Sequence, residues 1–131
     1  MKNALVLLAG GDGKRLGSSK PKQFIIIDNT TLIEYLLENL NPEIFDIIII
    51  VTKNNYKKKY LYNLKKKFFY HNIKYTKSGK TRQISTLNSL LFLKKFKIKN
   101  VLIHDSARPL ASNFLFKKII KKLEKNISCI P

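Results

Sequence analysis

Arginine and glycine are scarce in this chain of 131 residues, and they gather in three short segments. Twenty-three of the 26 basic residues are lysine, and the three arginines are Arg15, Arg82 and Arg108. A planar guanidinium is needed where two oxygens are bound at once, whereas lysine suffices for a plain positive charge. Four of the five glycines lie between residues 10 and 17, and glycine allows a ligand to approach the backbone closely. The three segments are therefore candidates for a binding site.

The first segment, residues 8–23, is a glycine-rich loop that also carries two cations, Arg15 and Lys22. Consecutive backbone N–H groups in such a loop can bind phosphate oxygens. The cations would neutralise a triphosphate and the charge that develops when it is displaced. No Gly-Lys-Ser or Gly-Lys-Thr closes the loop, and Leu16 stands where a dinucleotide-binding fingerprint has its third glycine. The segment therefore indicates a nucleoside triphosphate bound by a loop of a different type.

The second segment, residues 78–85, contains Gly79 and then opens a helix. Gly79 permits close backbone approach, so backbone groups there can read the edge of a base. Arg82 and Ser85 are about one helical turn apart, and we expect them to share a face.

The third segment, residues 104–109, reads His-Asp-Ser-Ala-Arg-Pro and follows an apolar run. A carboxylate at the carboxyl end of a strand, facing a phosphate loop, is well placed to hold Mg²⁺, which makes Asp105 the candidate ligand. Arg108 would pair with Asp105 or with a phosphate. His104 alternates with Ile103, and we expect it to pack rather than to react.

Apolar runs predict strands at residues 4–9, 47–51, 73–76 and 101–103, with a short extended piece at 24–27. Helical spacing of apolar residues predicts helices between and after them. This alternation is typical of a Rossmann-like α/β fold, a mostly parallel sheet with helices on both faces. Ligands bind beyond the carboxyl ends of such strands, where all three segments lie. Residues 127–130 are expected to begin a further strand, which indicates a chain truncated at its C-terminal end.

Capping residues mark three of the predicted helix starts. Thr31 and Glu34 fit a capping box, and Thr81 and Ser112 can cap two later helices. The residues expected to face the sheet are Tyr56, Tyr60, Leu61, Leu64 and Phe68 in the second helix; Ile84, Leu87, Leu90 and Leu91 in the third; and Leu115, Phe116, Ile119, Ile120 and Leu123 in the fourth.

A net charge of +18 raises nucleic-acid binding as a hypothesis. The lysines crowd helix-like segments, however, and we interpret them as solvated faces, so no nucleic-acid partner is expected. No stretch approaches the roughly 20 apolar residues of a membrane span, so no membrane contact is expected. The single cysteine, Cys129, excludes an internal disulfide framework, and we expect a cytoplasmic protein.

The three segments together resemble the 2-C-methyl-D-erythritol 4-phosphate cytidylyltransferase family. They read Ala-Gly-Gly-Asp-Gly-Lys-Arg at 9–15 with Pro-Lys-Gln at 21–23, Gly-Lys-Thr-Arg-Gln-Ile-Ser at 79–85, and His-Asp-Ser-Ala-Arg-Pro at 104–109. The resemblance implies an α/β nucleotidyltransferase fold in which residues 1–131 form an incomplete CTP-binding domain. The C-terminal part of the family's chain, with the arm that pairs two subunits, would be missing, and the full-length protein would be a homodimer.

The resemblance also implies a reaction. A phosphate oxygen of the polyol phosphate attacks the α-phosphorus of CTP, and pyrophosphate leaves, in non-mevalonate isoprenoid biosynthesis. Mg²⁺ would be the cofactor. The residues we assign are Arg15 and Lys22 to catalysis, Asp105 to the metal, and Ala9, Gly10, Gly11, Asp12, Gly13, Gly79, Lys80, Arg82, Ser85, Ser106 and Arg108 to nucleotide binding.

Two alternatives stay open. Ala9-Gly10-Gly11 and Asn88-Ser89 also resemble the sister ribitol 5-phosphate cytidylyltransferases, so ribitol 5-phosphate, or another polyol or sugar phosphate, is the alternative acceptor. A basic nucleic-acid-binding protein with an α/β fold is the alternative from a different class. The residues that bind the acceptor are expected largely beyond residue 131, where a second enzyme domain could also be fused.

Overall fold

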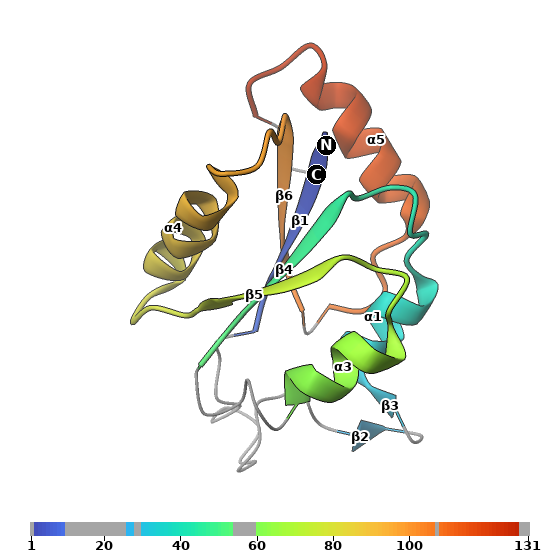
Figure 1. Ribbon diagram of the computed structural model, residues 1–131. Helices are drawn as coiled ribbons and strands as arrows, with labels where there is room; N and C mark the ends of the chain where they lie inside the picture. Colours follow the sequence, from blue (N-terminus) through green and yellow to red (C-terminus); the bar gives the residue numbers. More distant parts are fainter. Residues whose placement is uncertain (1, 10–25, 28–29, 54–59, 107, 129–131) are drawn as a thin grey trace.

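The computed structural model describes residues 2–9, 26–27, 30–53, 60–106 and 108–128. Four strands form one sheet in the order β5-β4-β1-β6, and every pair is parallel (Figure 1). They are β1 (Asn3–Leu8), β4 (Ile47–Thr52), β5 (Ile73–Lys77) and β6 (Asn100–Asp105). The four predicted strands are confirmed to within two residues at each end. The end of the predicted extended piece forms β2 (Ile26–Ile27), which pairs antiparallel with β3 (Thr30–Thr31).

The middle of the sheet is fully apolar. Residues 4–7 of β1 and 47–51 of β4 are buried, as expected for strands that are covered on both faces. In the register of the sheet Leu5 lies between Ile48 of β4 and Leu102 of β6. Successive side chains of β1 then point to opposite faces, so each face of the sheet has its own hydrophobic core.

The helices divide unequally between the two faces. Leu5, Leu7 and the inward residues of three helices share one core, and these helices are α1 (Leu32–Asn39), α3 (Tyr62–Lys67) and α5 (Asn113–Leu123). Among the described helices, only α4 (Arg82–Leu93) contributes to the core on the opposite face, through Leu93 and Phe92. Figure 1 shows α4 on one side of the sheet and the other three helices on the other side. The predicted two-sided α/β layering is confirmed for the described residues.

The three predicted capping residues all cap. The hydroxyl oxygens of Thr31, Thr81 and Ser112 accept hydrogen bonds from the backbone N–H groups three residues later, at 3.1, 3.2 and 3.1 Å. Each cap satisfies one of the N–H groups that a helix start leaves without a partner. Most inward residues predicted for the second and fourth helices are confirmed: Leu61, Leu64, Phe68 and Phe116 are buried, and Tyr60, Ile119, Ile120 and Leu123 pack partly buried against the same core. Leu115 is not among the residues packed there, and Tyr56 lies outside the described residues.

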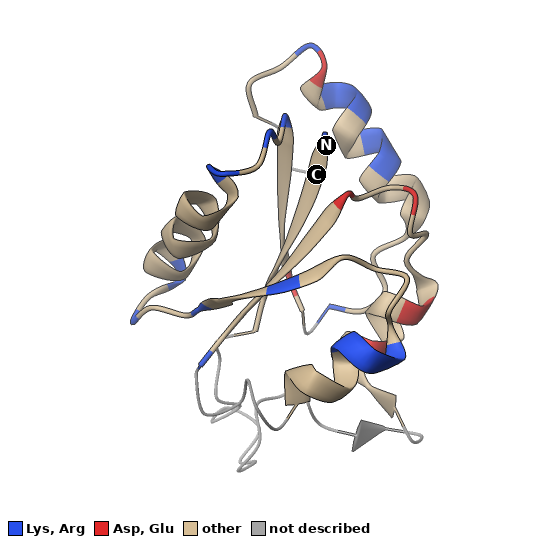
Figure 2. Ribbon diagram, viewed as in Figure 1, with Lys and Arg blue, Asp and Glu red and all other residues tan. Residues whose placement is uncertain are grey.

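The inward face predicted for α4 is wrong. The four residues expected to face the sheet are the exposed ones: Ile84 (43%), Leu87 (52%), Leu90 (39%) and Leu91 (54%). The residues that α4 buries are instead Ser85, Ser89 and Leu93, which lie four positions apart and form one stripe. Figure 2 shows that α4 is uncharged over most of its length, unlike the lysine-rich α5.

Helix α4 is thus rotated about its own axis relative to the orientation that its apolar residues predict. Two polar contacts at its N-terminal end account for this rotation. The hydroxyl oxygen of Ser85 accepts a hydrogen bond from the Gly79 N–H, and the Asn88 side-chain amide donates to the Lys77 carbonyl, both at 2.9 Å. The small side chains of Ser85 and Ser89 also allow close approach of the helix to the sheet. Helix amphipathicity predicts only which face is apolar, and here these contacts turn a different face inward.

The predicted strand at residues 127–130 does not begin where expected. Ile127 and Ser128 are not in a strand, and Ile127 is fully exposed; residues 129–130 lie outside the described part. An apolar run forms a strand only where a neighbouring strand supplies hydrogen bonds. Within the described residues, no helix is long and apolar enough to cross a membrane.

The rotation of α4 predicts opposite outcomes for two neighbouring substitutions. Ser89→Leu should lower the free energy of unfolding by about 1–3 kcal/mol, because Ser89 is fully buried and a larger side chain would overpack the interface with the sheet. Leu87→Lys should change it by no more than about 0.5 kcal/mol, because Leu87 is half-exposed. Urea unfolding followed by circular dichroism measures both. A large loss in Leu87→Lys with none in Ser89→Leu would contradict the observed rotation.

His71 is a buried titratable group beneath α1. Its Nε2–H donates to the Leu37 carbonyl oxygen at 3.1 Å, and the ring lies 4.8 Å from that of Tyr70. Burial lowers the pKa of His71 below its usual 6.5, and the hydrogen bond to Leu37 opposes this only in part. The folded protein therefore holds His71 neutral at a pH where the unfolded chain already binds a proton.

Stability should consequently fall as the pH drops below about 6.5, with a slope of at most about 1.4 kcal/mol per pH unit from this residue. His71→Gln keeps an N–H donor but cannot titrate, so the free energy of unfolding of this variant should depend less on pH between pH 5 and 7.5. Urea midpoints at four pH values in this range provide the measurement. The only other carboxylate or histidine with a shifted pKa among the described residues, Asp46, has a pKa lowered from 3.8 and does not interfere there. An equal slope in His71→Gln would overturn the assignment.

Candidate nucleotide-binding site

The four parallel strands end at one edge of the sheet, and hydrogen bonds tie these ends together. The Ala9 N–H donates to the Val51 carbonyl at 2.7 Å, and the Thr52 hydroxyl donates to the Ala9 carbonyl at 3.0 Å. On the next strand, the Ser78 N–H donates to the Thr52 carbonyl at 2.9 Å. Ala9 is buried and is the last described residue at the start of the glycine-rich segment. The start of that segment is therefore held at the carboxyl edge of the sheet.

Six of the predicted site residues lie outside the described part of the chain: Gly10, Gly11, Asp12, Gly13, Arg15 and Lys22. Their roles stay predictions. Of the remaining predicted residues, Ala9 follows β1, and the others come from the β5–α4 loop, the first turn of α4 and the end of β6, all at the same edge of the sheet.

The β5–α4 loop, residues 78–81, packs tightly on the first turn of α4. A Cβ atom on Gly79 would lie 2.1 Å from the Cγ2 atom of Ile84, so only glycine fits there. The Gly79 N–H is bound by the Ser85 hydroxyl oxygen, and Ser85 is buried. Lys80 and Arg82 are exposed. Contrary to the expectation from their spacing, Arg82 and Ser85 therefore do not share one environment, because Arg82 is exposed and Ser85 is buried. The loop presents two cations and its own backbone to solvent.

At the end of β6, Asp105 and Ser106 have different roles in the structure. The Asp105 carboxylate is about one-third exposed and lies 4.0 Å from the Nε atom of Arg108, whose side chain is mostly exposed. Ser106 is fully buried, and both its N–H and its hydroxyl donate to the Leu8 carbonyl, at 3.2 and 2.8 Å. The Ser106 hydroxyl proton is thus bound within the protein, and this side chain supports the end of β1.

His104 packs, as the sequence indicated. Its Nε2–H donates to the Arg108 carbonyl oxygen at 2.8 Å, and its ring lies edge-on to Phe116 at 5.7 Å. These contacts fix the turn that carries Asp105 and Arg108. His104 is therefore a structural residue of this turn.

The donor set fits a metal ion that is shared with a phosphate ligand. No group of three or more His, Cys, Asp or Glu side chains that could hold a metal is found among the described residues. Mg²⁺, however, is usually bound through one or two carboxylates, with phosphate oxygens and waters completing its shell. Asp105 provides one such carboxylate at the sheet edge.

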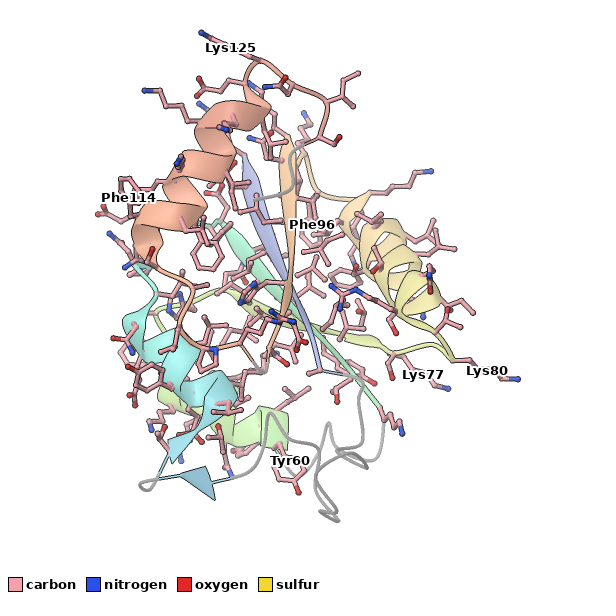
Figure 3. All side chains as sticks on the ribbon, turned by 180° about the vertical axis from the view of Figure 1, so that it is seen from behind. Tyr60, Lys77, Lys80, Phe96, Phe114 and Lys125 are labelled. Carbon is pink, nitrogen blue, oxygen red and sulfur yellow. The ribbon has the colours of Figure 1, made fainter. Side chains whose placement is uncertain are left out.

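Among the described residues at this edge of the sheet, the charged ones are mainly cationic. Lys53 follows β4, the β5–α4 loop and helix start contribute Lys80 and Arg82, and Arg108 follows β6. Asp105 is the one acid among these described segments. Figure 3 shows Lys77 and Lys80 together at the β5–α4 turn, and Lys125 at the far end of the molecule. An edge with this charge attracts a polyanion such as a triphosphate.

Sequence reasoning missed Thr52 and the structural role of Asn88. Thr52 is fully buried. In the sequence it directly follows the apolar run Ile47–Val51, and this polar residue at the carboxyl end of a buried strand could have indicated its role. Asn88 lies in the middle of a helix, where asparagine is a poor helix former. An asparagine in the middle of a helix is often present because its side chain makes a hydrogen bond outside the helix.

The described residues have an α/β fold of the nucleotidyltransferase type. The sequence profile of the IspD family, 2-C-methyl-D-erythritol 4-phosphate cytidylyltransferase, matches residues 3–131. The chain belongs to this family.

Individual relatives agree with this assignment. The 2-C-methyl-D-erythritol 4-phosphate cytidylyltransferase of Thermosipho melanesiensis is 40% identical over 115 residues, which are 84% of this chain and 49% of that protein. The structure of 4-diphosphocytidyl-2C-methyl-D-erythritol synthase from Anaerococcus prevotii has a TM-score of 0.76 and 27% identity, covering 95% of this chain and 52% of that one. Rv0371C of Mycobacterium tuberculosis, solved as a complex with manganese, shares the fold alone (TM-score 0.59, 14% identity, 92% and 59% coverage). The chain spans about half the length of the curated relatives it matches.

Two buried threonines on adjacent strands give a matched test of the ties at this edge. Thr52→Val removes the hydrogen bond to Ala9 and should lower the free energy of unfolding by about 0.5–1.5 kcal/mol. Thr76 is also buried, but its hydroxyl has no hydrogen-bond partner among the described residues. Thr76→Val should therefore be neutral or stabilising. Urea unfolding measures both, and amide exchange at Ala9 should accelerate only in Thr52→Val; equal effects of the two substitutions would contradict the role given to Thr52.

Proposed function

We propose that this chain binds CTP and transfers its cytidylyl group to 2-C-methyl-D-erythritol 4-phosphate, with release of pyrophosphate. The observation that carries the proposal is the order of the family's three segments, which all follow strands of one parallel sheet and leave its carboxyl edge. This edge is where ligands bind in such folds. The route served would be non-mevalonate isoprenoid biosynthesis.

The roles of the residues follow from charge and position. Arg15 and Lys22 stabilise the negative charge that accumulates as the acceptor phosphate oxygen bonds to the α-phosphorus and the bond to pyrophosphate breaks. The backbone of Ala9–Gly13 contacts the nucleotide phosphates. Gly79 and Lys80 contact the base and ribose, Ser85 holds the Gly79 N–H for this purpose, and Arg82 and Arg108 add positive charge at the rim.

Asp105 is the residue that would hold Mg²⁺. When bound, the ion supplies positive charge to the phosphate oxygens. The 4.0 Å separation from Arg108 leaves the Asp105 carboxylate in a weak, exposed ion pair that a ligand can rearrange. The Ser106 hydroxyl acts indirectly, by fixing the end of β1, where the glycine-rich segment begins.

A second acceptor is supported by two sequence features. The Ala9-Gly10-Gly11 start of the first segment and Asn88-Ser89 in α4 are similar to ribitol 5-phosphate cytidylyltransferases. The homodimer, the cytoplasmic location and the absence of a nucleic-acid partner stay predictions.

Pyrophosphate release with CTP and Mg²⁺ tests the proposal, with 2-C-methylerythritol 4-phosphate and ribitol 5-phosphate offered separately. Turnover with the first alone supports the isoprenoid route, and turnover with the second alone moves the activity to the sister family. No turnover and no CTP binding would overturn the proposal. DNA or RNA binding that weakens steeply with salt would then favour the nucleic-acid-binding alternative.

Arg15→Ala should lower turnover by about 10²–10⁴-fold, the scale of losing one charge-stabilising group in the transition state. Lys125→Ala is the control, because Lys125 is an exposed cation at the far end of the molecule (Figure 3). It removes the same formal charge and should leave the rate within about twofold, since Lys125 is exposed and salt screens the interactions of exposed charges with distant groups. An unchanged rate in Arg15→Ala would exclude its catalytic role.

A further inference from the structure

Asn88 makes a contact that differs in kind from those of two other asparagines in and after helices. Asn39 and Asn126 each donate to the carbonyl four residues before them, at 2.9 Å, so their contacts are local. The Asn88 side-chain amide donates instead to the Lys77 carbonyl, 11 residues away at the end of β5. It therefore joins the second turn of α4 to the strand from which the nucleotide-binding loop departs.

Three hydrogen bonds hold the end of β5 and the beginning of the β5–α4 loop, and that of Asn88 to Lys77 is one of them. The Ser78 N–H is bound by the Thr52 carbonyl of the neighbouring strand, and the Gly79 N–H is bound by the Ser85 hydroxyl, both at 2.9 Å. Ser85 and Asn88 are three residues apart on α4, so the two side chains hold residues 77 and 79 from one helix face. Residues 77–79 therefore have few conformations left.

The tight packing of Gly79 makes the position of the loop depend on the position of α4. A Cβ atom at Gly79 would lie 2.5 Å from the Cβ of Ile84 and 3.3 Å from its carbonyl carbon. At this separation the helix start and the loop move together. A contact that fixes α4 relative to β5 thus also fixes the backbone of Gly79 and Lys80.

We propose that Asn88 is a positioning residue for nucleotide binding: it holds α4 against the end of β5, and thereby sets the conformation in which residues 78–81 meet the base and ribose. The inference rests on the proposed function for its ligand, a cytidine nucleotide. Asn88 does not itself contact the ligand. Its effect is on affinity, because a loop ordered before binding loses less conformational freedom when the ligand arrives.

The test uses Asn88→Ala and Asn88→Leu in the 131-residue chain. Both remove the amide donor, and both replace asparagine by a better helix former, so loss of the helix does not explain an effect. Asn72→Ala is the matched control, because the Asn72 amide also makes a long-range hydrogen bond to a backbone carbonyl, that of Asp46, but at the opposite end of β5. The measurements are amide hydrogen exchange at Gly79, the dissociation constant for CTP, and urea unfolding.

Both Asn88 variants are expected to speed exchange at Gly79 by about 5–10-fold, the effect of losing one hydrogen bond that restrains local opening. The dissociation constant for CTP should rise by a similar factor, while urea stability changes little. Asn72→Ala should leave exchange at Gly79 and CTP affinity within about twofold of the unmodified chain, although its stability falls.

Exchange at Gly79 and CTP affinity that both stay within twofold in the Asn88 variants would overturn the proposal. Faster exchange with unchanged affinity would overturn the link between the loop and the nucleotide. An unmodified chain that does not bind CTP would overturn the proposed function and the nucleotide part of this inference together, whereas exchange at Gly79 would still decide whether Asn88 holds the loop.

Discussion

The parallel pairing of β1 with a strand on each side is the constraint on which the rest of this structure depends. Its backbone is hydrogen-bonded to β4 and to β6, and its side chains at 4–7 are buried in two different cores. A strand with no free edge and no solvent-facing side has one allowed position. The carboxyl end of β1, where the glycine-rich segment begins, is consequently the best-determined point of the candidate site.

Polar contacts extend this order from the sheet into the site. Thr52 and Ser106 approach the last residues of β1 from its two neighbouring strands and bind the carbonyls of Ala9 and Leu8. Both side chains are fully buried, and a hydrogen bond in such surroundings is strong because water does not compete for it. The same kind of contact, from Ser85 and Asn88, orders the loop after β5. The site is thus built on short polar side chains that bind backbone groups, while the cations at its rim are exposed.

The orientation of α4 shows how these contacts compete with hydrophobic burial. Its apolar residues Ile84, Leu87 and Leu91 have the spacing of an inward face, yet they are exposed. Serine side chains occupy the interface instead, and they allow the helix to approach the sheet closely enough for Asn88 to reach Lys77. The apolar stripe that results is unusual for a surface helix, and it lies on the same face of the sheet as Ile103 of the edge strand β6.

The sequence by itself determined the elements and the order of the site segments. Buried strands, capping residues and the sets of residues around Gly79 and Asp105 are local patterns, and local patterns are read directly from neighbouring residues. The structure alone decided which side of α4 faces the sheet, that the Ser106 hydroxyl is bound inside the protein, and that Thr52 and Asn88 support the site. Each of these depends on partners that are distant along the chain: Leu8 and Ser106, for example, are 98 residues apart. Periodicity identifies a face and a motif identifies a residue type, but only the tertiary structure brings a buried hydroxyl or amide to the one carbonyl that it can bind.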